Sequence, residues 1–300
     1  MRHPRSDEVL VRSRFGAVSR GTEALVFAGR VPASEGERMR APFQGGSFAF
    51  PLKYGYAVVG EVAAGPPPLL GRTVFCLHPH QDRFVVPADA VHLVPDGVPA
   101  SRAVLAANME TALNIVWDAG ILPGDRVAVV GGGTVGLLAA WLASGVPGTD
   151  TVLVDIDPAR RAVTERLGLA FALPGAADGE RDCCLHVSGS PDGLASAIEL
   201  AGFEARVVEA SWYGTDLVPL ALGAAFHARR LTIVSSQVGH VPAGRRARWT
   251  PSRRMASALA LLADPRLDAL VLGETAFVDL PGAYAGILAS PATLCHRIVY

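Results

Sequence analysis

The stretch DRVAVVGGGTVGLLAAWLASGVPGTDTVLVDIDPARR, residues 125–161, decides the fold of this chain. Its first part, Arg126–Val130, is a short β-branched run, typical of a strand buried on both faces of a parallel sheet. From residue 135 onward the apolar residues recur at helical spacing. The uncharged run 127–146 is long enough to suggest a membrane span, but its three consecutive glycines and its β-branched first third favour a strand, a turn and a helix.

The glycines of this turn follow the spacing G-x-G-x-x-G, at Gly131, Gly133 and Gly136. A dinucleotide-binding turn needs one glycine for the tight bend, one for the approach of the pyrophosphate and one for close packing of the helix. Thr134 and Val135 then supply free N–H groups at the start of the helix, facing the phosphates. The alternative is a glycine-rich turn of another α/β fold. The strand, helix and acidic residue found together favour dinucleotide binding.

Asp155 ends the second apolar strand, residues 151–154, about 20 residues beyond the last glycine. A carboxylate at this place accepts hydrogen bonds from the 2′-hydroxyl of the adenine ribose and repels a 2′-phosphate. We therefore expect NAD(H) to be the preferred cofactor. Arg160 and Arg161 follow closely and soften that repulsion, which leaves NADP(H) possible.

Composition and charge narrow the class of protein. A chain of 300 residues, 50% hydrophobic and 18% charged, is typical of a compact enzyme of about two domains. The net charge of −1 predicts no nucleic-acid partner. The beginning of the chain, MRHPRSDEVLVR, has no apolar segment that would direct export, and the cysteines form no C-x-x-C pair. We expect a reduced, cytoplasmic protein without a membrane segment.

Residues 8–107 contain short strands broken by Gly and Pro, which predicts a small, mostly antiparallel barrel or sandwich ahead of the nucleotide-binding part. The ordered landmarks SRGTE (19–23), PLKYGYAVVGEV (51–62), METAL (109–113), PGDRVAVVGGGTVG and DIDPARR resemble those of the medium-chain dehydrogenase/reductase superfamily, the zinc-type alcohol dehydrogenases and their zinc-free relatives.

This resemblance implies an α/β fold in which a Rossmann doubly wound parallel sheet is inserted in a GroES-like, mostly antiparallel β domain. Residues 1–107 and 241–300 would form the GroES-like catalytic domain and residues 108–240 the Rossmann domain. The final segment TLCHRIVY is then expected to return as a strand of the first domain. A homodimer is also possible by the same resemblance.

The chain departs from the family pattern in three places. Only seven residues precede EVLVR, where relatives carry a hairpin, so either the barrel lacks its first strands or the start site is misassigned. The lobe with four cysteine ligands for a structural zinc is missing. Between residues 170–172 and 183–188, the third and fourth Rossmann strands, ten residues remain. They can cross the sheet only in extended form, so we expect a crossover without a helix.

The resemblance also assigns the catalytic positions. The zinc-ligand positions of the family hold Arg20, Tyr56 and Glu110, which implies an enzyme without zinc and with Arg20 as a fixed positive charge. Thr22 matches the hydroxyl that relays a proton, Tyr56 is the expected donor with a pKa lowered by the guanidinium, and Glu110 pairs with Arg20 or acts as base. The alternatives are a structural salt bridge of Arg20 with Glu23 or Glu110, and Tyr56 as a half-buried aromatic residue.

Polar residues follow the later strands of the Rossmann part, at the carboxyl ends where cofactors lie in doubly wound sheets. We expect the nicotinamide half of the cofactor to be lined there by Ser188, Ser190, Tyr213 and Ser236. Cys183, Cys184 and His186 lie in an apolar strand and are expected in the core.

Two further polar groups have alternative interpretations. His78 and His80, in HPHQDR, belong either to a substrate pocket or to a polar loop. The arginine-rich run GRRARWTPSRRM (244–255) is either a solvated surface, or the source of one or two side chains that reach the cofactor pyrophosphate or an anionic substrate.

The residues and the resemblance together predict a zinc-independent, NAD(H)-dependent oxidoreductase that moves hydride between the nicotinamide and a carbonyl or secondary alcohol of a small-molecule substrate. Residues 19–32 also resemble the bacteriochlorophyllide 2-hydroxyethyl dehydrogenases, which points to a secondary alcohol on a bulky substrate. The alternatives are a quinone or enone reductase of the same superfamily, or a non-catalytic dinucleotide-binding regulatory protein. Hydride exchange with labelled cofactor separates enzyme from regulator.

Overall fold

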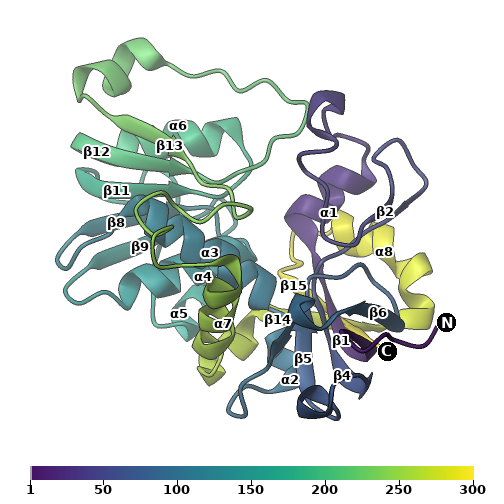
Figure 1. The fold of residues 1–300 in the computed structure, drawn as a ribbon. Coiled ribbons are helices and arrows are strands. Elements are labelled where there is room, and N and C mark those ends of the chain that lie inside the picture. The colour runs from purple at the N-terminus through teal and green to yellow at the C-terminus, as the bar shows by residue number, and fades with distance from the viewer. Residues whose placement is uncertain (1) are drawn as a thin grey trace. The chain divides into compact units, whose positions relative to one another are not determined.

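The computed structural model describes residues 2–300, and their contacts divide the chain into two compact units. Unit 1 combines the described residues up to Ala107 with Ser252–Tyr300, and unit 2 is Asn108–Pro251. Unit 1 is therefore built from both ends of the chain, coloured purple to blue and yellow in Figure 1. No helix within residues 2–300 is long and apolar enough to cross a membrane.

Unit 1 contains a seven-stranded sheet with the order β14-β15-β1-β4-β5-β7, and β6 pairs with β1 outside this path. All pairs are antiparallel except β14 with β15. The strands are β1 (Glu8–Ser19), β4 (Val58–Ala64), β5 (Thr73–Cys76), β6 (Arg83–Pro87), β7 (Val91–Leu93), β14 (Val271–Ala276) and β15 (Cys295–Val299). The predicted returning strand is confirmed: β15 pairs antiparallel with β1, with Phe15 opposite Val299.

Alternating burial along the strands builds the core of unit 1. Val9 and Val11 of β1 face Val58, Val62 and other apolar side chains of β4 to β7, as the period of two in a half-buried strand requires. A second cluster joins Val18, Leu280 and Ile298. The remaining elements are α1 (Arg20–Phe27), α2 (Ala100–Ala103), α7 (Pro251–Leu261), α8 (Leu280–Ala289), the short pair β2 (Gly45–Gly46) and β3 (Leu52–Lys53), and 3-10 turns at Ala33–Glu35, Pro67–Leu69, Ala88–Ala90, Pro265–Leu270 and Phe277–Asp279.

Unit 2 is organised on a six-stranded, wholly parallel sheet in the order β10-β9-β8-β11-β12-β13. In this order β8, the first strand of the unit, lies near the centre, with β9 and β10 on one side of it and β11 to β13 on the other (Figure 1). This is the order of a Rossmann doubly wound sheet, so the predicted fold class is confirmed. Its strands are β8 (Arg126–Val130), β9 (Asp150–Val154), β10 (Ala170–Ala172), β11 (Arg181–His186), β12 (Ala201–Glu209) and β13 (Thr232–Ser235).

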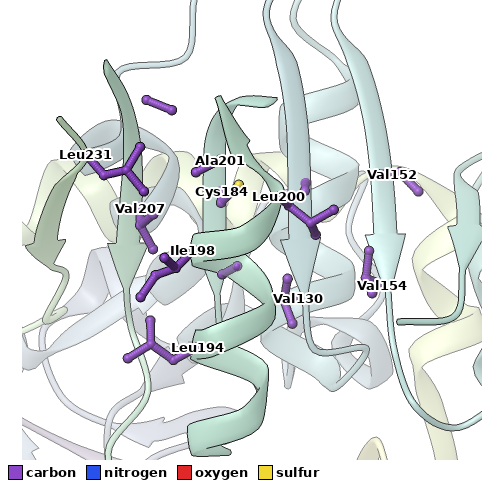
Figure 2. Close-up of a cluster of buried hydrophobic side chains, with 13 residues drawn as sticks. Val130, Val152, Val154, Cys184, Leu194, Ile198, Leu200, Ala201, Val207 and Leu231 are labelled. Atoms are coloured by element: carbon purple, nitrogen blue, oxygen red, sulfur yellow. The ribbon is translucent and has the colours of Figure 1, made fainter. Parts of the chain in front are cut away.

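The helices α4 (Thr134–Ser144), α5 (Arg160–Arg166) and α6 (Pro191–Leu200) contact the strands of this sheet. Unit 2 also contains most of α3 (Ala106–Ala119) and a π-helical turn at Leu222–Phe226. Figure 2 shows Leu194 and Ile198 of α6 beside Val207 of β12, in the cluster that also holds Cys184. Cys183 and Cys184 are both buried, as predicted. Residues 173–180 join β10 to β11 by turns without a helix, which confirms the expected bare crossover.

Candidate functional site

The glycine turn between β8 and α4 has two packed positions and one open one. A Cβ on Gly131, whose φ is +115°, would lie 2.7 Å from the Cα atom of Ser188, and one on Gly136 would lie 1.8 Å from the carbonyl oxygen of Gly131. A Cβ on Gly133 would meet nothing within 4 Å. The protein therefore leaves space beside Gly133 at the N-terminus of α4, where Thr134 and Val135 begin the helix, and this geometry fits a pyrophosphate.

Asp155 lies against this turn. Its carboxylate accepts hydrogen bonds from the backbone N–H of Gly132 at 2.5 Å and of Asp157 at 2.8 Å. Arg160 begins α5 and is buried, with its Nε 3.7 Å from a carboxylate oxygen of Asp157. Arg161 instead lies over the ring of Phe171, 4.7 Å from its centroid. The structure thus brings Asp155 and Arg160 to the glycine turn and leaves Arg161 on the side of β10.

The carboxyl ends of β11 and β12 carry a hydrogen-bonded cluster. The His186 ring is fully buried, as expected for a core residue, yet its Nε2 lies 2.6 Å from Ser188 Oγ and its Nδ1 lies 2.7 Å from Glu209 Oε2. The Tyr213 hydroxyl donates to Glu209 Oε2 at 2.9 Å, and the Ser211 N–H donates to Glu209 Oε1 at 2.7 Å. Burial alone would raise the pKa of Glu209, but the bonds from His186, Ser211 and Tyr213 lower it, so the carboxylate is ionised.

Ser188 and Tyr213 were predicted near the cofactor, whereas Glu209 and the polar role of His186 were not predicted from the sequence. The available signal was the pairing of two parallel strands, because His186 and Glu209 each end a strand and are register partners.

The other two residues predicted near the nicotinamide, Ser190 and Ser236, have different hydrogen-bond partners. Ser190 precedes α6 and its N–H donates to Ser188 Oγ at 3.1 Å, whereas the Ser236 hydroxyl donates to Asp118 of α3 at 2.7 Å.

The predicted catalytic residues divide between the two units. Arg20 and Thr22 lie in the first turn of α1, and Tyr56 just precedes β4, all in unit 1. The Arg20 Nε donates to the carbonyl of Leu288 at 3.2 Å. Glu110 is buried on α3, in unit 2.

The expected pKa of Tyr56 is wrong. Burial, together with the negative charge of Glu23, raises the pKa of Tyr56 to about 12, and hydrogen bonds with Ser19 and Thr22 only partly oppose this. Desolvation disfavours the phenolate more than these two hydroxyls favour it. The Tyr56 phenol is therefore a neutral donor hydrogen-bonded to Ser19 and Thr22.

A buried carboxylate that the sequence suggested only as an ion-pair partner of Arg20 has other hydrogen-bond partners in unit 1. Glu23, 1% exposed, accepts the N–H of Ser19 at 2.7 Å, and its other oxygen lies 2.9 Å from His80 Nε2 and 2.5 Å from the Tyr284 hydroxyl. Burial raises the pKa of Glu23, but His80, Tyr284 and Ser19 together lower it below its ordinary value. Residues distant in sequence thus stabilise one ionised carboxylate.

His78 and His80 are not equivalent. His78 stacks on Phe84 with ring centroids 3.8 Å apart, its Nδ1 lies 2.9 Å from the Pro79 carbonyl, and burial lowers its pKa to about 4. His80 lines a cavity of about 400 Å³. The cavity is otherwise lined mainly by Phe27, Phe50, Leu52, Tyr54, Leu280 and Tyr284. His80 therefore lines a cavity, whereas His78 is packed in the core, a position that neither alternative predicted.

The arginine-rich run is partly packed. The Arg245 guanidinium lies 5.2 Å from the ring centroid of Trp117, and Arg246 Nε donates to the Val241 carbonyl at 2.8 Å. Arg254 is buried on α7. Within residues 2–300, no three His, Cys, Asp or Glu side chains are grouped to hold a metal ion.

Comparison with known proteins finds dehydrogenases. No family model matches the chain. L-threonine 3-dehydrogenase of Mesorhizobium japonicum is 27% identical over 119 residues, which are 40% of this chain and 34% of that protein. L-galactonate-5-dehydrogenase of Escherichia coli is 36% identical over 99 residues, 33% of this chain and 29% of that protein. The matched stretches therefore span about a third of these relatives.

Solved structures share the fold over the whole chain. A putative zinc-binding dehydrogenase of Clostridium scindens has a TM-score of 0.79 at 16% identity, covering 100% of this chain and 92% of that one. A putative zinc-binding dehydrogenase of Sinorhizobium meliloti, bound to NADP, has a TM-score of 0.76 at 17% identity, covering 100% and 94%. A short chain alcohol dehydrogenase of E. coli, complexed with NADH, has a TM-score of 0.76 at 14% identity with the same coverage. The relatives and structural neighbours are zinc-binding or alcohol-type dehydrogenases.

Proposed function

We propose that this protein is a nicotinamide-dependent oxidoreductase of the dehydrogenase type, which moves hydride between NAD(H) and a carbonyl or secondary alcohol of a small molecule without zinc. The observation that carries the proposal is the open space beside Gly133 at the N-terminus of α4, with Asp155 and Arg160 against the same turn. The dehydrogenase relatives support this class of reaction.

The residues of unit 2 divide the binding of the cofactor between them. The N–H groups at the start of α4 bind the pyrophosphate, and Asp155 accepts hydrogen bonds from the adenine ribose. Ser188 and Tyr213 lie at the carboxyl ends of the strands, the side on which doubly wound sheets bind nucleotides. When bound, the nicotinamide ring accepts or donates the hydride.

Hydroxyl groups of unit 1 supply the proton. Because the pKa of Tyr56 is raised to about 12, the phenol stays protonated and donates, through its hydrogen bond with Thr22, to the oxygen of a carbonyl that is being reduced. Arg20 is proposed to hydrogen-bond the developing negative charge on that oxygen. Glu110, in unit 2, is proposed as the base.

The donor chemistry in unit 1 supports a reaction without zinc. A guanidinium such as that of Arg20 has no lone pair to offer a metal, and the phenol of Tyr56, with its pKa raised to about 12, retains its proton. The residues at these two positions therefore do not fit a zinc ion, and no step requires one.

The test is transfer of labelled hydride from NADH to a panel of ketones, together with metal analysis of the purified protein. We expect transfer without stoichiometric zinc. Tyr56→Phe should reduce the rate by about 10² to 10⁴ and leave NADH affinity unchanged. Since the pKa of Tyr56 is about 12, the wild-type rate should show no loss of this donor between pH 6 and 10.

Two outcomes contradict the proposal. NADH binding without hydride transfer to any ketone would identify a dinucleotide-binding regulator. Stoichiometric zinc that a chelator removes together with activity would overturn the metal-free mechanism. Tyr300→Phe, which removes a different buried phenol from unit 1, serves as the control for Tyr56→Phe.

A further inference from the structure

The cavity of unit 1 is bordered by aromatic side chains that the fold does not bury. Phe27, the last residue of α1, is 53% exposed, and Phe50 is 48% exposed. Both line the hollow that also contacts Leu52, Leu280 and Pro281. Large apolar side chains left exposed around one cavity are typical of a site for an apolar ligand.

The wall also carries polar groups: Lys53, whose Nζ donates to Gln81 Oε1 at 2.8 Å, His80, whose buried Nδ1 has no partner within residues 2–300, and Tyr54. Within residues 2–300 the Tyr54 hydroxyl has no hydrogen-bond partner, although its ring packs against Tyr56 with centroids 6.0 Å apart. Burial raises the pKa of Tyr54, so the hydroxyl is a neutral donor. The Glu23 carboxylate beside it already accepts from Ser19, His80 and Tyr284. The cavity therefore offers a mainly apolar surface on which Tyr54 is the available hydroxyl donor, with Lys53 and His80 Nδ1 as further polar groups of the wall.

We propose that this cavity binds a neutral aromatic molecule carrying a single carbonyl or hydroxyl oxygen, with its ring against Phe27 and Phe50 and its oxygen accepting from Tyr54. A volume of about 400 Å³ is in the range of small-molecule sites. If the cavity is the substrate site, the assignment rests on the proposed function and specifies the class of substrate. As a binding site, it can be tested without turnover.

The wall chemistry argues against a polyol. Each hydroxyl of a sugar alcohol that faces an apolar wall loses its hydrogen bonds to water and gains none. The cavity offers apolar contacts from Phe27, Phe50, Leu52 and Leu280. The assigned ligand therefore differs in chemistry from the sugar acid in the name of the E. coli relative.

The test compares acetophenone with ethylbenzene, which has the same ring and chain length but no oxygen. Equilibrium dialysis of the full chain, without cofactor, should show saturable binding of acetophenone about fivefold tighter than ethylbenzene, the effect of one hydrogen bond. Tyr54→Phe should remove this difference and retain ethylbenzene binding. Tyr300→Phe removes a phenol that does not line the cavity and should preserve the difference.

The aromatic wall is tested by Phe27→Ser, which should weaken the binding of acetophenone and of ethylbenzene by about tenfold. Phe203→Ser is the matched control, because Phe203 is 65% exposed on β12 of unit 2, and it should leave both affinities unchanged. The proposal is overturned if acetophenone does not bind saturably, if Phe203→Ser weakens it as much as Phe27→Ser, or if xylitol displaces it at equal concentration.

These results distinguish failure of the cavity assignment from failure of the oxidoreductase proposal. If acetophenone binds as described but labelled hydride reaches no ketone, the oxidoreductase proposal fails and the cavity assignment stands. If NADH reduces other ketones while acetophenone does not bind, the cavity assignment fails and the oxidoreductase proposal stands.

Discussion

At the scale of single residues, one carboxylate is proposed to select between the two nicotinamide cofactors. Asp155 follows β9 and accepts the N–H of Gly132, so its negative charge lies against the glycine turn. A 2′-phosphate beside it would place two like charges close together, and the nearby Arg160 offsets this only in part because it is also 3.7 Å from Asp157. Cofactor selection is therefore expected to depend on Asp155.

We predict that the wild-type protein binds NADH at least about tenfold more tightly than NADPH, a difference of about 1.4 kcal/mol. Asp155→Asn keeps the size of the side chain but removes the charge, so NADPH should gain affinity and NADH should lose some. Asp182→Asn removes the same charge at the start of β11, away from the strand end that carries Asp155, and should keep the preference. Fluorescence titration of all three proteins decides this. Tighter NADPH binding by the wild type would contradict the role of Asp155.

At the scale of elements, the unit β8, turn and α4 uses its glycines for two different purposes. Gly136 allows the helix to approach the turn, since a Cβ there would lie 1.8 Å from the Gly131 carbonyl oxygen. Gly133 has no such contact in the protein, because a Cβ there meets nothing within 4 Å. Gly136 is thus required for packing, and Gly133 is proposed to leave space for the ligand.

The two glycines should therefore respond differently to the same substitution. Gly133→Val should fold normally and lose NADH binding, because the branched side chain occupies the space of the pyrophosphate. Gly136→Val should lower the free energy of unfolding by about 3 kcal/mol, an overpacking effect. Urea unfolding without cofactor and NADH titration measure the two effects. A folded Gly133→Val variant with normal NADH affinity would refute the nucleotide assignment.

At the scale of the whole molecule, the two units contain different parts of the proposed site. Unit 2 contains the glycine turn, Asp155 and the cluster around His186, whereas unit 1 contains Tyr56, Glu23 and the aromatic cavity. All four tryptophans, Trp117, Trp141, Trp212 and Trp249, also lie in unit 2. Tryptophan fluorescence therefore reports on the unit proposed to bind the cofactor.

We predict that NADH raises the midpoint of thermal unfolding followed by tryptophan fluorescence. A ligand at 100 times its Kd that binds only the folded state stabilises it by about 2.7 kcal/mol. Gly133→Val is the control, because it should unfold at the wild-type temperature and show no rise. An unchanged midpoint for the wild type at saturating NADH would mean that the cofactor does not bind unit 2.

Local patterns in the sequence were sufficient for the framework of this protein. The strand, glycine turn and helix, the position of Asp155 at the end of β9, and the crossover without a helix were all predicted, because each depends on spacing or length within a few tens of residues. The return of the last strand to β1 was predicted only through the resemblance to a family. It was confirmed by the register of β15.

The polar clusters depended on contacts that the sequence does not display. Glu23, His80 and Tyr284 are far apart in the chain and meet because α1, the segment before β6 and α8 pack together. His186 and Glu209 meet because two parallel strands end side by side. The pKa of Tyr56 was predicted in the wrong direction because burial and the charge of Glu23 raise it more than the hydrogen bonds with Ser19 and Thr22 lower it. Periodicity and spacing predict which element a residue belongs to, but only packing determines its burial and its distant partners, and these set the charge of each group.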